Sequence, residues 1–179
     1  MNYAIDIDRA VEDEDQATAL QLAEQWVADA PEDAAAWGKL AHVHEMGGDL
    51  LRANIAATEA LRISPDDQPY LFEKGYIEYR LANYAEAAHA FSACVEQAEM
   101  TDDSFYLDAA RIAQARCLAL RGQIRLAADV IAAAVPGSAT WLDGRFSRED
   151  VVKSFGLDTR KNRHVQYTAP SKTNDSPED

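Results

Sequence analysis

The 179-residue sequence predicts an all-α fold in which pairs of antiparallel helices stack into a solenoid. Pro31 and Pro65 stand in matching contexts, DAPEDAAAW and RISPDDQPY, and each ends a stretch with apolar residues at every third or fourth position. That spacing is typical of helices with one buried face. Because a proline cannot continue a helix and the aspartates after each proline can cap the next one, the two prolines mark the ends of equivalent repeating units.

Residues 34–67 form the first clear unit, which divides into two helical pieces at Gly47, Gly48 and Asp49. The glycines permit a positive φ in the turn, and the aspartate can cap the second helix. The predicted buried stripes are Trp37, Leu40, Ala41 and His44 in the first piece, and Leu50, Ala53, Ala57, Ala60 and Leu61 in the second. The alanines in these stripes would let the two helices approach closely.

This unit resembles a tetratricopeptide repeat (TPR), whose pattern runs from a tryptophan through small and aromatic residues to a closing proline. The matching residues are Trp37, Leu40, Ala41, Ala53, Ala60 and Pro65. His44 and Ala57 replace the two aromatic residues of the pattern. The resemblance implies a TPR solenoid of about three helix pairs.

Two further units follow, at residues 68–101 and 102–137. The first matches the TPR pattern through Leu71, Gly75, Leu81, Asn83, Tyr84, Ala87, Phe91 and Cys94, with Glu78 in a place that is usually aromatic. The second matches through Ala115, Leu118, Gly122, Ala127, Ile131 and Ala134. It starts about six residues late, so we expect an insertion near residues 100–108 that lengthens its first helix.

The two ends of the chain are predicted to cap the solenoid. Residues 1–33 form an acidic N-terminal capping repeat, in which residues 15–31 resemble a second TPR helix and the residues before them are too acidic for a convincing partner helix. Residues 138–166 form a C-terminal capping extension. It contains a short helix capped by Ser147, and its apolar residues Trp141, Leu142, Phe146, Val151, Val152 and Phe155 are expected to seal the last repeat. Residues 167–179 are predicted to be disordered.

The charge of the chain narrows the choice of partners. The net charge is −14, and residues 1–33 alone carry ten acidic residues against one arginine. An acidic surface repels phosphate backbones and anionic lipids, so we expect no nucleic-acid partner. The sequence contains no signal peptide and no apolar run long enough to insert into a membrane, which predicts a cytoplasmic protein. A basic or apolar protein segment suits the acidic surface better.

The motifs of enzymes and of cofactor or metal sites are missing from the sequence. It contains no phosphate-binding glycine loop, zinc spacing or nucleophile elbow. His42 and His44 lie two apart on a helix and point to nearly opposite sides, which disfavours a shared metal ion. Cys94 and Cys117 are interpreted as two buried thiols. We therefore predict a protein that is not an enzyme and has no cofactor.

The resemblance implies that the first helix of each repeat lines a concave side on which a peptide binds. Carried onto this sequence, the predicted peptide-binding residues are His42, Met46, Phe72, Tyr76, Tyr79, Arg80, Ile112 and Arg116. Phe72, Tyr76 and Tyr79 follow each other at intervals of four and three, so they form an aromatic ridge on one face of the helix. This ridge either lines the groove or is buried in the core. Arg80 and Arg116 could form hydrogen bonds with the peptide.

The function indicated is a protein-interaction module that holds a partner segment as an adaptor or chaperone. TPR domains that clamp acidic C-termini line the groove with lysines and asparagines, whereas the corresponding places here hold Gly38, His42, Tyr76 and Arg116. Two alternatives stay open: a structural subunit of a larger assembly, and a secretion chaperone of the type III translocator class, which the chain resembles in architecture. Because exposed repeat ends often pair, a homodimer is also open.

Overall fold

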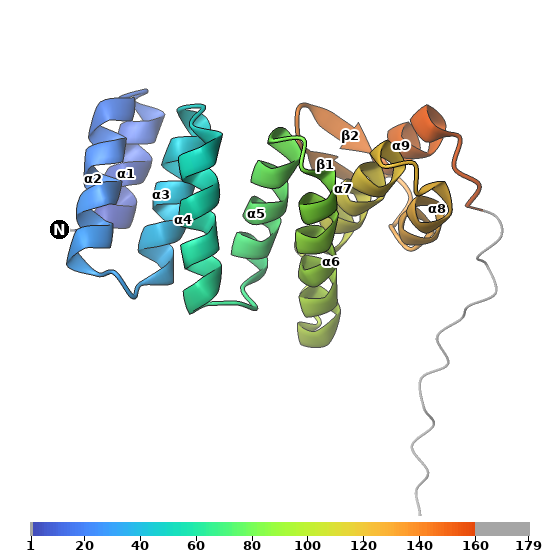
Figure 1. Cartoon of the computed structure of the whole chain (residues 1–179), viewed down its shortest axis with the longest axis horizontal. Helices are drawn as coiled ribbons and strands as arrows, with labels where there is room; N and C mark the ends of the chain where they lie inside the picture. The colour runs from blue at the N-terminus through green and yellow to red at the C-terminus, as the bar shows by residue number, and fades with distance from the viewer. Residues whose placement is uncertain (1, 160–179) are drawn as a thin grey trace, which may run out of the picture.

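The computed structural model describes residues 2–159, which form a row of stacked helices with a small hairpin near the C-terminal end (Figure 1). The helices are α1 (Tyr3–Glu12), α2 (Gln16–Asp29), α3 (Ala34–Met46), α4 (Leu50–Ile63), α5 (Gln68–Arg80), α6 (Tyr84–Thr101), α7 (Leu107–Leu120), α8 (Ile124–Ala132) and α9 (Arg148–Phe155); the strands are β1 (Ala139–Trp141) and β2 (Arg145–Ser147). The predicted all-α solenoid is confirmed. The predicted disordered tail, residues 167–179, lies outside the described residues.

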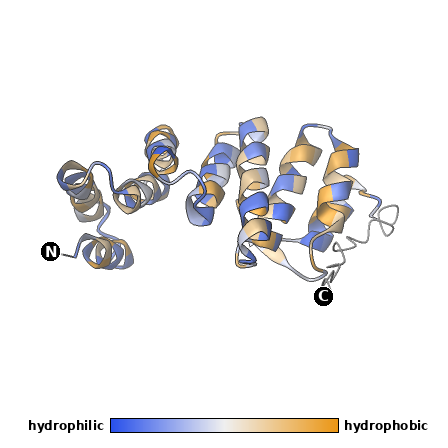
Figure 2. Ribbon diagram, turned by 90° about the horizontal axis from the view of Figure 1, so that it is seen from below, coloured by the Kyte–Doolittle hydropathy of each residue, from blue (hydrophilic) through white to orange (hydrophobic). Residues whose placement is uncertain are grey.

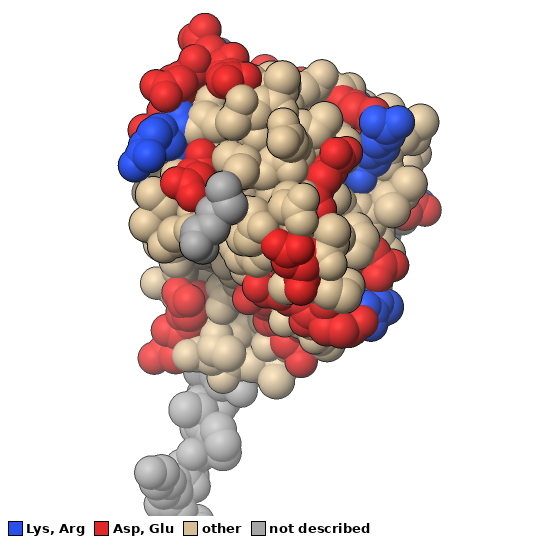
Figure 3. Space-filling view, turned by 90° about the vertical axis from the view of Figure 1, so that its left-hand side faces the viewer, with Lys and Arg blue, Asp and Glu red and all other residues tan. Residues whose placement is uncertain are grey.

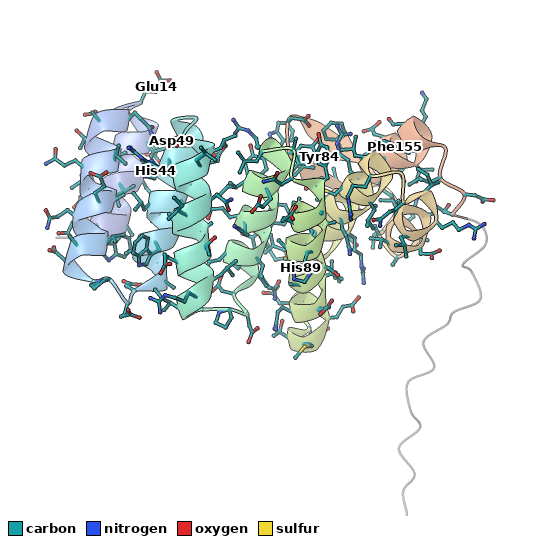
Figure 4. All side chains as sticks on the ribbon, viewed as in Figure 1. Glu14, His44, Asp49, Tyr84, His89 and Phe155 are labelled. Carbon is teal, nitrogen blue, oxygen red and sulfur yellow. The ribbon has the colours of Figure 1, made fainter. Side chains whose placement is uncertain are left out.

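The turn inside each of the first four helix pairs has the same backbone geometry. One residue of each turn has a positive φ: Glu14, Gly48, Ala82 and Gly122. The amide of the next residue then donates to the carbonyl five positions back, at 2.8 Å for Asp15 and 2.9 Å in the other three turns. This is the bonding of a Schellman turn, which satisfies carbonyls at the helix end. Figure 4 labels Glu14 and Asp49, which lie in the first two of these turns along the same edge of the row of helices, at the top of the view.

The turns show that the repeat begins earlier than the sequence indicated. Glu14, Gly48 and Ala82 recur at one constant interval, which is also the interval between Pro31 and Pro65. Helices α1 and α2 therefore form a complete pair, and the prediction that no convincing helix precedes residue 15 is wrong. Ile7 and Ala10 of α1 are buried, and Tyr3 and Val11 pack partly buried against the same cluster, so α1 has an apolar face that its acidic residues concealed in the sequence. Acidic side chains cover much of this end of the molecule (Figure 3).

The insertion lies in a different element from the one expected. The interval from Ala82 to Gly122 exceeds the constant one, and the additional length lies in α6, which has 18 residues, and in the connection after it. Helix α7 has 14 residues, so the prediction that the insertion lengthens the first helix of the third unit is wrong. Asp102 ends α6 in the left-handed conformation, with a φ of 55°.

Alanines fill much of the space between the helices. Ala53, Ala56, Ala57 and Ala60 of α4 are all buried. The first three belong to one hydrophobic cluster with residues of α1, α2 and α3 and with Ile77 of α5. A second cluster joins α5 to α9, and Phe91 is its largest fully buried side chain. Hydrophilic and hydrophobic residues both occur on the helices (Figure 2), but the buried faces differ: α2 and α4 bury one stripe each, whereas α3 and α7 have buried residues on more than one side.

A polar network joins α4 to α5, where one hydrophobic cluster gives way to the other. Lys74 of α5 donates to Asn54 and Thr58 of α4 and lies 3.0 Å from the carboxylate of Glu78. Burial alone would raise the pKa of Glu78, but hydrogen bonds from Asn83 and Lys74 outweigh it and lower the pKa. Glu78, which occupies a position that is usually aromatic in the TPR pattern, is therefore buried as an ion pair with Lys74.

The C-terminal segment packs on the last helices. Strands β1 and β2 pair antiparallel, with Thr140 opposite Phe146, and β1 contacts α7. Ser147 and Asp150 form a capping box at the start of α9, which confirms the predicted cap. The hairpin itself was not predicted, because three-residue strands leave almost no alternating pattern in a sequence.

The positive φ in the repeated turn predicts opposite effects on stability for two substitutions. We expect Ala82→Gly to raise the free energy of unfolding by about 1 kcal/mol, because glycine adopts a positive φ without the steric penalty of a side chain. Ala82 is exposed, so no packing is lost. Gly48→Ala should lower stability by a similar amount, since an added methyl group meets nothing within 4 Å and only the backbone cost remains.

Thermal and urea unfolding followed by circular dichroism measures both variants. Equal stability of Ala82→Gly and wild type would contradict the assigned turn geometry.

Candidate functional site: a groove along helices α3 and α5

Three adjoining cavities form one continuous groove, which runs from α1 past α3 and α5 to the hairpin. The cavity at the α1 end has a volume of about 370 Å³, the central one about 430 Å³ and the one at the hairpin about 360 Å³. The first two share His42, Pro69 and Glu73. The last two share Phe72, Tyr106 and Trp141. We call this surface the groove.

Three of the predicted peptide-binding residues line the groove. His42 of α3 is exposed, and Phe72 and Tyr76 of α5 are half-buried. Phe72 also packs edge-on against the buried ring of Phe91, which holds it in place. The proximity of these three side chains agrees with the expectation that first helices line the concave side.

Tyr79, the third residue of the predicted ridge, belongs to the core. It is only 6% exposed, and its hydroxyl accepts a 2.7 Å hydrogen bond from Arg116 and donates to Asp143 at 3.2 Å. The guanidinium of Arg116 also lies 3.7 Å from the ring centroid of Phe146. The expectation that Tyr79 and Arg116 face a peptide is therefore wrong: they attach the hairpin to α5 and α7.

Ile112 and Met46 do not line the groove as predicted, and Arg80 contacts residues that line it. Ile112 is fully buried, so its assignment as a peptide contact is wrong. Met46 is half-exposed at the end of α3 and lines none of the three cavities of the groove. Arg80 pairs with Glu45 and lies 5.8 Å from the ring centroid of Tyr76, so it supports two residues of the groove wall.

Sequence reasoning missed three further aromatic residues that line the groove. Phe105 and Tyr106 lie within the insertion, and Trp141 comes from β1. Phe105 is 80% exposed, and Trp141 is 67% exposed instead of sealing the last repeat as predicted. The sequence signal that could have revealed them is the aromatic pair Phe105 and Tyr106 in an otherwise acidic connection. Exposed aromatic residues beside a concave surface are typical of binding sites.

Glu73 lies where the central cavity meets the cavity at the α1 end, and its side chain is only 22% exposed. Burial, together with the nearby charge of Glu45, raises the pKa of this carboxyl from 4.5 to about 7. The nearest basic nitrogen is Nδ1 of His42, at 4.0 Å. The groove thus holds an acidic group that is partly protonated near neutral pH.

Neither cysteine is suited to thiol chemistry. Burial raises the pKa of both Cys94 and Cys117 to about 12, so almost no thiolate forms at neutral pH. Both thiols are free, as predicted. Among residues 2–159 the structure contains no group of three or more metal-ligating side chains, and no helix there combines the length and hydrophobicity needed to cross a bilayer.

Comparison with known proteins supports the fold. No protein-family model and no curated protein sequence matches the chain. The TPR2B domain of yeast Sti1, solved in complex with pHsp70, superposes with a TM-score of 0.61 at 14% identity, covering 64% of this chain and 92% of that one. A putative kinesin light chain with TPR-like repeats from Podospora anserina gives 0.62 at 18% identity, covering 70% and 68%. The chain therefore has the TPR fold.

The raised pKa of Glu73 predicts how stability depends on pH. Because the folded protein holds this proton more tightly than the unfolded chain, the contribution is present in full below pH 4.5 and is lost as pH rises through 7. Glu73→Gln lacks the ionisation, so we expect the variant to gain up to about 3 kcal/mol over wild type between pH 4 and pH 8.

Urea unfolding of wild type and Glu73→Gln at a series of pH values checks this expectation. A stability difference that stays constant from pH 4 to pH 8 would contradict it.

Proposed function

We propose that the chain is a non-enzymatic protein-interaction module that holds a segment of a partner protein in the groove, as an adaptor or chaperone. The observation that carries the proposal is the groove itself, a continuous channel with aromatic residues along it. A segment laid across α3 and α5 would cover Phe72 and Tyr76 of α5 together with Tyr106 and Trp141, which line the same cavity. Burial of aromatic rings supplies much of the binding energy at protein interfaces.

The Sti1 domain was solved with pHsp70, which supports a protein ligand for this fold. The chemistry of the groove here disfavours an acidic one, because Glu45 and Glu73 line the central cavity and would repel a carboxylate. We therefore propose an apolar or basic segment.

We expect Tyr76→Ala combined with Trp141→Ala to abolish binding of the partner, because the double variant removes two rings of the central cavity, one from α5 and one from β1. Leu51→Ala is the matched control: Leu51 is an exposed apolar residue of α4, which contributes no side chain to the groove. Affinity purification of tagged variants, with copurifying proteins quantified by mass spectrometry, measures the loss. Partners retained by the double variant would contradict the groove assignment.

A second candidate function is that of a fixed subunit in a larger assembly. Leu51 and Ile55 of α4 favour it, since they lie one helical turn apart and are both largely exposed. In that case Leu51→Ala, and not the groove variant, should lose the copurifying proteins. The same purification thus separates the two candidates.

A further inference from the structure

The central cavity of the groove combines aromatic rings with carboxylates. Phe72, Tyr76, Tyr106 and Trp141 supply the rings, and Glu45 and Glu73 supply the acids. The faces of aromatic rings carry partial negative charge and attract cations, most strongly where water is displaced. Rings and carboxylates therefore favour the same kind of ligand group.

In the described part of the chain no lysine or arginine forms an ion pair with Glu73, although the charge of Lys39 acts to lower its pKa. Glu45 is paired with Arg80, and Lys39 is paired with Asp8 on α1. Among the residues that the structure describes, no lysine or arginine lies within 4.0 Å of the Glu73 carboxylate, and His42 reaches it only at that limit.

Because Glu73 is largely buried, the lack of a paired cation has an energetic cost. An isolated carboxylate in a poorly solvated place is costly, so the group stays partly protonated until a cation arrives. The pKa of about 7 for Glu73 agrees with this description. A cation that entered the cavity would restore the charged form of Glu73 and gain a charge-assisted hydrogen bond.

We propose that Glu73 and the rings around it form a subsite for one lysine or arginine side chain of the segment held in the groove. This inference rests on the proposed function and adds the chemistry of the partner. A long basic side chain suits the cavity, because its alkyl part packs on rings while its charged end reaches the carboxylate. The neighbouring cavity, lined by Phe105 and Trp141, would hold an apolar side chain of the same segment.

Binding should depend on pH. The ligand competes with a proton for Glu73, so affinity should rise as pH increases from 6 to 8. The other charged or titratable groups near Glu73 are His42, Lys39 and Glu45 of α3, Tyr70 of α5, and Tyr106 just before α7. Lys39 and Glu45 already have charged partners, Asp8 and Arg80. A rise in affinity that is absent from Glu73→Gln would assign the pH dependence to Glu73.

The test uses random peptides displayed on phage, selected against the full chain. We expect wild type to enrich peptides with a lysine or arginine near an aromatic or aliphatic residue. For a selected peptide, Glu73→Gln should weaken binding about tenfold to a hundredfold. Replacing the basic residue of the peptide by glutamine should weaken binding to wild type by a similar factor but have little further effect on Glu73→Gln, so the two changes are not additive.

Two controls separate the possible failures. Glu12→Gln removes the same charge from the exposed end of α1 and should bind like wild type. Tyr76→Ala should weaken all selected peptides, whatever their charge. Selected peptides without basic residues, or additive effects of the two glutamine changes, would overturn the cation subsite and leave the groove intact. Selection of no peptide, or peptides that Tyr76→Ala still binds, would overturn both the subsite and the groove.

Discussion

The stacking of Arg116 on Phe146 attaches the C-terminal hairpin to the solenoid, and the groove depends on this contact. Arg116 lies 3.7 Å from the ring centroid and also donates to the hydroxyl of Tyr79 on α5. Asp143, in the turn of the hairpin, accepts from the same hydroxyl. One arginine of α7 thus connects the hairpin to two helices. With the hairpin in this place, Trp141 lines the central cavity together with Phe72 and Tyr76.

The helix pairs of the solenoid are built on a turn that repeats with high regularity. Each of the first four pairs reverses through one residue with a positive φ followed by a helix N-cap residue, and in the first three pairs these turns recur at a constant interval. Alanines at the helix contacts let the pairs stack closely. The stacking places His42 of α3 beside Glu73 of α5, although the two residues are far apart in sequence.

The sequence predicted those features that a local pattern encodes. The prolines and the apolar spacing predicted the repeat and its helices, and the aspartates predicted the caps that Asp33, Asp49 and Asp67 form. The sequence did not predict features that depend on which other element a residue packs against. Helix α1 has an apolar face around Ile7 and Ala10, but its acidic residues concealed it. Tyr79 and Arg116 have the spacing of groove residues, but the hairpin covers them, and no local pattern predicts where so short a hairpin docks.

The most direct measurement for the groove is a hydrogen-exchange footprint of a bound peptide selected on the chain. We predict slower amide exchange in α5 around Phe72 and Tyr76, in the connection at Phe105 and Tyr106, and in β1. Exchange in α4 should not change. Protection confined to α4 and α6, with β1 and the connection unaffected, would contradict the account, because it would place the ligand on the helices that do not line the groove.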